Sequence, residues 1–199
     1  MMNSDSIPVL IDEFFSKLGD AHQDIYNEIS LQLELGIFLR QRLQTTDNPN
    51  RRVQFERNIR DFVPNTKGFV KKEIDISIVD DGCLTTAIEL KFPTNGQVPE
   101  QMFKFCEDIR FTEQLIRSDC QSAFVLVLAD RQFYSSAARL KGDGIYAYFR
   151  RSETLEGRIQ QPTGDTAKVI ELEGSYSISW NSIPEIKPRE LCYTVIEAK

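Results

Sequence analysis

The chain has 199 residues, of which 41% are hydrophobic and 27% charged, a composition typical of a folded globular protein and not of a disordered one. This length suits a single domain over residues 1–199 with a sizeable core. The formal net charge of −6 argues against broad electrostatic binding of nucleic acid, although it leaves room for a local basic groove.

Hydrophobic runs in the chain are short. The stretch from Ala123 to Ala129 is among the longest, and it is far too short to cross a bilayer. The N-terminus carries no basic region followed by an apolar stretch, so we expect neither a secretory signal nor a membrane partner.

The cysteines do not form a metal-binding pattern. None of the four, Cys83, Cys106, Cys120 and Cys192, belongs to a C-x-x-C pair. The one histidine, His22, has no partner in any recognisable motif, and we expect a surface or capping role for it. We therefore exclude a structural zinc site and predict reduced thiols in a cytoplasmic protein.

The first predicted element is a helix over residues 20–43. Alternating apolar residues at 29, 31, 33, 35 and 37 also fit a strand, but the length and the Gln, Glu, Leu and Arg content favour a helix. Its predicted apolar stripe is formed by Ile25, Ile29, Leu33, Leu35, Leu39 and Leu43. Gly36 lies on the same face and would permit the close approach of a neighbouring element.

Three strands are expected next, over residues 52–62, 69–79 and 84–92, with a hairpin turn at Asp80-Asp81-Gly82. A helix from Pro99 to about Arg117 precedes a buried strand at 123–128 and a short helix at 135–140. From residue 144 the pattern is mostly β, with strands expected at 145–150, 167–172, 176–180 and 191–197.

These elements predict an α/β fold. A central mixed β-sheet flanked by helices would form a core over residues 20–130, and residues 144–199 would form a β-rich C-terminal extension.

Charged residues alternate with aliphatic ones on the two strands that the hairpin joins. The aliphatic side chains at 74, 76, 78, 88 and 90 would face one core layer, so that Asp75, Glu89 and Lys91 project together on the other side. Paired carboxylates suit Mg²⁺, which can polarise a phosphodiester and activate a water. A nearby lysine can orient that water or neutralise developing charge.

A second acidic clue lies in the first helix. Glu28 and Gln32 are one turn apart inside the predicted apolar stripe, whereas Glu34 lies on the opposite side. A glutamate in a buried stripe is costly unless it is paired or binds metal. We therefore predict that Glu28 is largely buried and points toward Asp75 and Glu89, that Gln32 supports the site and that Glu34 is exposed.

The segment Glu73-Ile74-Asp75-Ile76, a short hairpin and the segment Ile88-Glu89-Leu90-Lys91 together resemble the motif of the PD-(D/E)XK, or restriction-endonuclease-like, nucleases. The order helix, three strands, helix, strand over residues 20–130 is the core order of that superfamily. Ile74 stands where the family motif has a proline.

The resemblance implies a role for each matching residue. Asp75 and Glu89 would bind Mg²⁺ or Mn²⁺, with the Leu90 carbonyl as a third ligand. Lys91 would assist the attacking water, and Glu28 would support the site as the acidic residue of the first helix.

Gln101 and Phe105 show a weaker resemblance, to the Q-x-x-x-Y pattern of the RecB-like branch. Gln101 is thus a candidate supporting residue, and a polar residue on a helix surface is an equally good interpretation. For the basic clusters at 51, 52 and 57 and at 67, 71 and 72 we favour a solvated face. The aromatic residues at 133, 134, 146, 148 and 149 are expected in the β-core and hairpin pairs.

The sequence therefore predicts a nuclease that hydrolyses phosphodiester bonds in DNA and requires Mg²⁺ or Mn²⁺; a homodimer is possible. Two alternatives stay open. A catalytically silent nuclease-like module would bind nucleic acid or a protein partner with the same sheet, and the acidic net charge favours it. A structural α/β domain would carry the charged face as a solvent-exposed edge.

Overall fold

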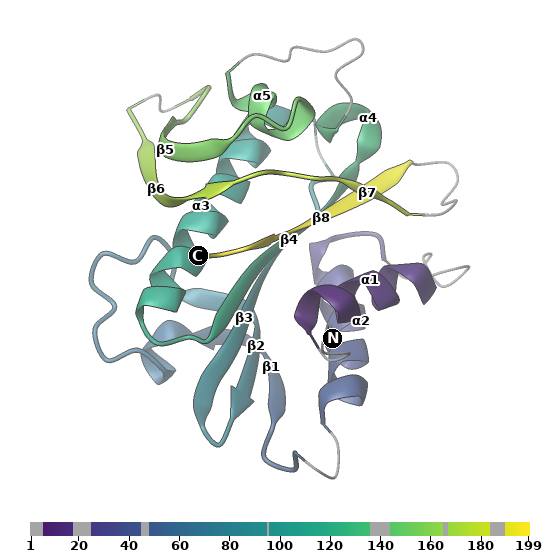
Figure 1. The fold of residues 1–199 in the computed structure, drawn as a ribbon, viewed down its shortest axis with the longest axis vertical. Helices are drawn as coiled ribbons and strands as arrows, with labels where there is room; N and C mark the ends of the chain where they lie inside the picture. Colours follow the sequence, from purple (N-terminus) through teal and green to yellow (C-terminus); the bar gives the residue numbers. More distant parts are fainter. Residues whose placement is uncertain are drawn as a thin grey trace.

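The computed structural model describes residues 6–17, 25–44, 48–94, 96–135, 144–164, 167–183 and 190–199, with the side chains at 132 and 133 excepted. The fold is mixed α/β: a six-stranded mixed sheet lies at the centre and helices flank it, as predicted (Figure 1). No helix among these residues is both long and apolar enough for a membrane span.

The elements in chain order are α1 (Ile7–Lys17), α2 (Glu28–Leu43), β1 (Arg52–Asn58), a 3₁₀ turn (Ile59–Asp61), β2 (Glu73–Asp80), β3 (Cys83–Lys91), α3 (Val98–Arg117), β4 (Ser122–Asp130), α4 (Arg131–Tyr134), α5 (Ile145–Arg150), β5 (Leu155–Gln160), β6 (Val169–Tyr176), β7 (Asn181–Ser182) and β8 (Leu191–Glu197). The sheet order is β1-β2-β3-β4-β8-β7, and β5 pairs with β6 in a separate ribbon. Strands β3 and β4 run parallel, whereas the other paired strands run antiparallel.

Strand β4 is buried on both faces, as its continuous apolar run predicts. Phe124, Leu126 and Leu128 pack toward α1 and α2. Val125 and Val127 pack toward α3 on the other face. The two helical layers therefore cover opposite faces of the sheet, and α3 packs against β3 and β4 (Figure 1).

Helix α2 begins at Glu28, where the side chain of Asn27 accepts a hydrogen bond from the backbone N–H of Ser30 at 2.8 Å. The predicted apolar stripe is wrong in part, because Ile29 is 73% and Leu33 51% exposed. Apolar residues occur almost all round this helix, so the wheel alone could not fix its phase. The buried side is formed by Leu31, Leu35, Leu39 and Leu43, which pack against the sheet.

Gly36 is required by a close approach. A Cβ atom added there would lie 2.1 Å from Cε1 of Phe55 on β1, so any side chain would displace the ring. The sequence expectation for this glycine is confirmed, and it fixes how near α2 lies to the edge of the sheet.

The C-terminal part departs from the prediction in several places. Residues 145–150 form helix α5 instead of a strand, because Phe149 packs against Phe105 of α3 with ring centroids 5.7 Å apart. This tertiary contact outweighs the β propensity of the local sequence. Tyr134 and Phe149 are core residues, but they lie on α4 and α5 and not in hairpin pairs.

Other boundaries also differ. Strand β6 ends at Tyr176, so residues 176–180 do not form the expected strand, and neither α1 nor β5 was predicted. Strand β8 has the predicted range, and it joins the central sheet beside β4. His22 and the expected helix at 135–140 fall on residues 18–24 and 136–143, outside the described part of the chain except for Ser135.

Candidate active site

The candidate site lies at the open end of the β2–β3 hairpin, opposite the turn that joins the two strands. The ladder runs from Asp80 and Cys83 at the turn to Ile76 and Ile88. Beyond that pair, the backbone N–H groups of Asp75 and Leu90 donate to side-chain carboxylates and not to carbonyls of the facing strand. Oδ2 of Asp75 accepts a hydrogen bond from the Leu90 N–H at 2.7 Å.

Glu89 meets Asp75 at this opening. The Asp75 N–H donates to Oε1 of Glu89 at 3.4 Å, so the two residues face each other across the separated strands. Glu89 is completely buried, with 0% of its surface exposed. The structure thus brings together the two carboxylates that the sequence singled out, and a one-residue register shift between Ile78 and Val79 sets them opposite each other.

A lysine from outside the strands contacts Glu89. The ammonium of Lys71, in the segment just before β2, forms an ion pair with Oε2 of Glu89 and donates to Oδ1 of Asp108 at 2.9 Å. Asp108 lies on α3 and is 2% exposed. The expectation that Lys71 belongs to a solvated basic face is wrong, whereas Lys67 and Lys72 are exposed as expected.

Lys91 lies on the other side of Asp108. Its ammonium donates to the Leu90 carbonyl at 2.7 Å and lies 3.2 Å from Oδ2 of Asp108 and 3.5 Å from Oε1 of Glu28. Oδ2 of Asp108 is buried and has no well-aligned hydrogen bond, so this ion pair is its polar contact. Asp75 and Glu89 therefore lie together with Lys71 and Asp108, and Lys91 contacts this group through Asp108.

Helix α2 supplies two more residues. Oε2 of Glu28 accepts from the Phe92 N–H at 3.0 Å, and Nε2 of Gln32 donates to the Asp75 carbonyl at 2.6 Å. The Glu28 side chain is 44% exposed, so the prediction of a largely buried carboxylate is wrong; it lies in the first turn of the helix, beside solvent. Glu34 is half-buried and not exposed.

A cavity of about 310 Å³ opens beside Glu28. Its lining includes Glu28, Phe92 and Gln101, and Gln101 is 8% exposed. Gln101 is therefore not the helix-surface residue of the simpler interpretation. The cavity gives the Glu28 side of the site a route to solvent.

Burial and like charges set the protonation of the carboxylates. Burial raises the pKa of Asp75 against the opposing effect of Lys71 and Lys91. Burial, followed by the nearby charge of Asp75, raises the pKa of Glu89 well above its usual range. Burial works against the charged form of Lys71, yet the neighbouring carboxylates raise its pKa, so it stays an ammonium.

The oxygen atoms at the site decide whether it suits a metal ion. Among the residues that the structure describes, no group of three or more His, Cys, Asp and Glu side chains could hold a metal ion. Mg²⁺, however, is usually bound by one or two carboxylates and keeps several waters. The Asp75 and Glu89 carboxylates and the Leu90 carbonyl are hard oxygen donors of that kind, so the donor set fits such a cation.

Sequence reasoning missed Lys71 and Asp108. A signal for Asp108 was present in the sequence, since the large apolar residues Phe105 and Phe111 lie three residues to either side of it, and both are fully buried on α3. A carboxylate on the buried side of a helix is costly unless it is paired, which is the same reason that singled out Glu28 in the sequence. No sequence signal indicated Lys71, because it lies outside the helices and strands. Its long side chain reaches Glu89 from there.

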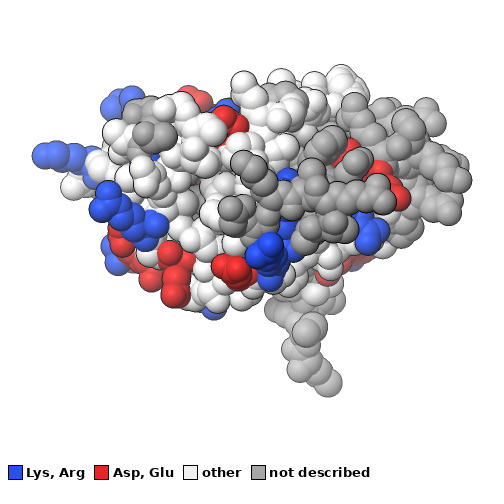
Figure 2. All heavy atoms as spheres, turned by 90° about the horizontal axis from the view of Figure 1, so that it is seen from above, with Lys and Arg blue, Asp and Glu red and all other residues white. Residues whose placement is uncertain are grey.

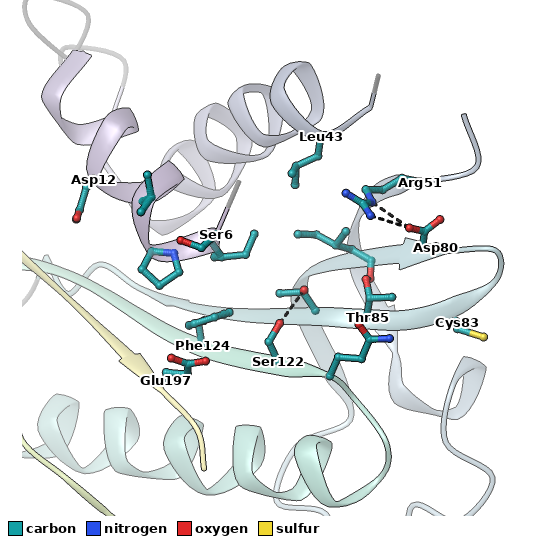
Figure 3. Close-up of a pocket in the computed structure, with 16 residues that line it drawn as sticks. Ser6, Asp12, Leu43, Arg51, Asp80, Cys83, Thr85, Ser122, Phe124 and Glu197 are labelled. Atoms are coloured by element: carbon teal, nitrogen blue, oxygen red, sulfur yellow. Dashed lines mark hydrogen bonds and ion pairs between the residues drawn. The ribbon is translucent and has the colours of Figure 1, made fainter. Parts of the chain in front are cut away.

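A larger cavity, of about 990 Å³, lies at the closed end of the hairpin (Figure 3). Its polar groups are paired locally: Arg51 donates to Asp80 at 2.8 Å, and the hydroxyls of Thr86 and Ser122 are 2.9 Å apart. Acidic and basic side chains lie intermixed on the face that Figure 2 shows. Volume and surface charge do not identify a site here; the buried charges do.

In comparisons with known proteins, no family model, no curated protein and no solved structure matches the chain.

Proposed function

We propose that this protein is a metal-dependent nuclease that hydrolyses phosphodiester bonds, with DNA as the expected substrate. The observation that supports the proposal is the opening of the β2–β3 ladder, where the Asp75 carboxylate meets the Leu90 backbone and the Asp75 N–H meets the Glu89 carboxylate. A fully buried carboxylate beside a half-buried one is an expensive arrangement unless a cation neutralises the pair. Mg²⁺ or Mn²⁺ is the cation that these oxygens suit.

The proposed roles follow from the contacts. Asp75, Glu89 and the Leu90 carbonyl would hold the metal, which when bound polarises the phosphodiester and acidifies a bound water. Lys91 lies next to the Leu90 carbonyl, where its ammonium would orient the attacking water and stabilise negative charge. Glu28 would hold Lys91 in place through its ion pair, and Gln32 would hold the Asp75 backbone.

The silent nuclease-like module is the second candidate, and one observation favours it. Lys71 already supplies positive charge to Glu89, so the carboxylates are partly neutralised without a metal. A module of this kind would keep the fold and bind its partner without cleaving it.

Cleavage of supercoiled plasmid tests the proposal. We expect nicking in the presence of Mg²⁺ or Mn²⁺ and its loss with EDTA. Asp75→Asn should lose cleavage and metal binding, whereas the matched change Asp80→Asn, at the other end of the same strand, should leave both intact. Metal binding without cleavage of plasmid, linear duplex, single-stranded DNA or RNA would favour the silent module.

A further inference from the structure

The charge balance of the candidate site is unusual. Four carboxylates, from Glu28, Asp75, Glu89 and Asp108, share the site with the two ammonium groups of Lys71 and Lys91, which leaves a formal charge of −2 when all are ionised. A divalent cation would cancel that charge. The site is therefore short of positive charge when all these groups are ionised, and Lys71 is the ammonium paired with Glu89.

Lys71 engages an oxygen that a metal would need. Both oxygens of Glu89 are in use: Oε1 accepts from the Asp75 N–H, and Oε2 is paired with the Lys71 ammonium. An ammonium and a divalent cation cannot both be bound at one carboxylate oxygen without strong repulsion, because the pair lies in a poorly solvated site. Metal binding to Glu89 therefore requires Lys71 to move.

The surroundings provide a second position for the ammonium. Oδ1 of Asp108 already accepts from Lys71 at 2.9 Å, so Lys71 can leave Glu89 and keep this partner. The Lys71 side chain is 28% exposed, which gives it access to solvent. Its backbone is fixed nearby, since Gln114 of α3 bonds to Val70 and Gly68 at 3.0 and 2.8 Å.

We propose that Lys71 is an intramolecular counter-ion that occupies the metal position at Glu89 and is displaced toward Asp108 when a divalent cation binds. The inference rests on the proposed function, because it takes Glu89 to be a metal ligand. It adds a property of this chain: metal affinity is set by competition with one of its own side chains. Lys71 is a positioning residue and not a ligand.

Calorimetric titration with Mn²⁺ tests the competition. Lys71→Met removes the charge and keeps most of the side-chain volume, and Lys72→Met is the matched control, since it removes the same charge from an exposed neighbour. We expect Lys71→Met to bind Mn²⁺ about tenfold more tightly or better, because one nearby positive charge is gone. Lys72→Met should bind as the wild type does, and Lys71→Arg should not gain affinity.

The outcomes separate the two proposals. Tighter binding in Lys71→Met supports the inference; binding in this variant alone also supports it, and then favours a silent native module. Wild-type binding with equal or weaker affinity in Lys71→Met overturns the inference and leaves the nuclease proposal standing. No Mn²⁺ binding in either protein overturns both.

A measurement on the wild type avoids any folding defect of the variant. The side-chain NH₃⁺ groups of lysines are observed by ¹⁵N NMR when ion pairs slow their exchange, and Lys71→Arg assigns the Lys71 signal. We expect this signal to shift or disappear on titration with Mg²⁺, which is diamagnetic. A Lys71 signal unchanged at Mg²⁺ saturation, as judged by the backbone shifts of Asp75 and Glu89, would overturn the inference.

Discussion

The two ends of the β2–β3 hairpin carry similar ion pairs in different surroundings. At the closed end Arg51 pairs with Asp80, and at the open end Lys71 pairs with Glu89. Both cations are 28% exposed, but the Asp80 side chain is 25% exposed and that of Glu89 0%. The closed end borders the larger cavity, of about 990 Å³, and the open end the smaller one.

This difference in burial indicates which end of the hairpin is the better candidate for a functional site. At the closed end one carboxylate meets one guanidinium near solvent, so the charges are balanced and screened. At the open end carboxylates outnumber ammonium groups, and two of the carboxylates, Glu89 and Asp108, are buried. Uncompensated buried charge is a feature of functional sites, whereas cavity size alone is not.

The largest expected effect is on cleavage. Lys91→Met should lower the rate of DNA cleavage by about a hundredfold to a thousandfold, the usual cost of losing one electrostatic stabiliser. Mn²⁺ binding should survive, because lysine is not a ligand. Arg51→Met, the matched change at the closed end, should leave the rate unchanged. Equal losses in the two variants would remove the distinction between the two ends.

The next effect is on stability, measured by urea denaturation without metal. Lys71→Met should lower the free energy of unfolding by about 3–5 kcal/mol, because it leaves the buried Glu89 charge without its partner. Arg51→Met should cost at most about 1 kcal/mol, since Asp80 is partly solvated. Similar costs for both would show that burial does not separate these ion pairs.

Mn²⁺ should restore part of the stability of Lys71→Met. Ligand at one hundred times its Kd stabilises the folded state by about 2.7 kcal/mol when it does not bind the unfolded chain. Repeating the denaturation of Lys71→Met and Arg51→Met at saturating Mn²⁺ measures this gain. We expect a shift in both variants, larger in Lys71→Met at any one Mn²⁺ concentration; the reverse order would contradict the competition.

The smallest expected effect is on the free energy of unfolding, for a change at the closed end of the hairpin. Ser122→Ala removes the hydroxyl pair with Thr86 and should cost about 1 kcal/mol, the net value of a typical hydrogen bond. Cleavage and Mn²⁺ affinity should not change, because Thr86 lies three residues from Glu89 and its side chain is on the opposite face of β3. A loss of Mn²⁺ affinity in this variant would indicate that the two ends are coupled.

Sequence patterns predicted much of the sheet. Strand alternation places Asp75 on one face of β2 and Glu89 on one face of β3, but it does not by itself bring them together. The ladder shifts by one residue between Ile78 and Val79; without that β-bulge, counting from the turn would set Asp75 opposite Ile88. The apolar run at 123–128 likewise indicated a strand buried on both faces, and β8 matched its predicted range.

Other features depend on tertiary contacts that the sequence does not encode locally. The phase of α2 was ambiguous because apolar residues surround it, and only packing on the sheet left Leu33 outside. Helix α5 has a strand-like sequence and is helical where Phe149 meets α3. Lys71 reaches Glu89 from a segment without regular structure, so no periodicity could connect the two residues.

The most direct test of the central claim is a crystal structure of the protein soaked in Mn²⁺, read from its anomalous difference density. The account predicts a peak within coordination distance of the Asp75 and Glu89 carboxylates and the Leu90 carbonyl, with the Lys71 ammonium moved from Glu89 toward Asp108. A crystal that shows no peak at this position at saturating Mn²⁺, with Lys71 still paired to Glu89, would contradict it.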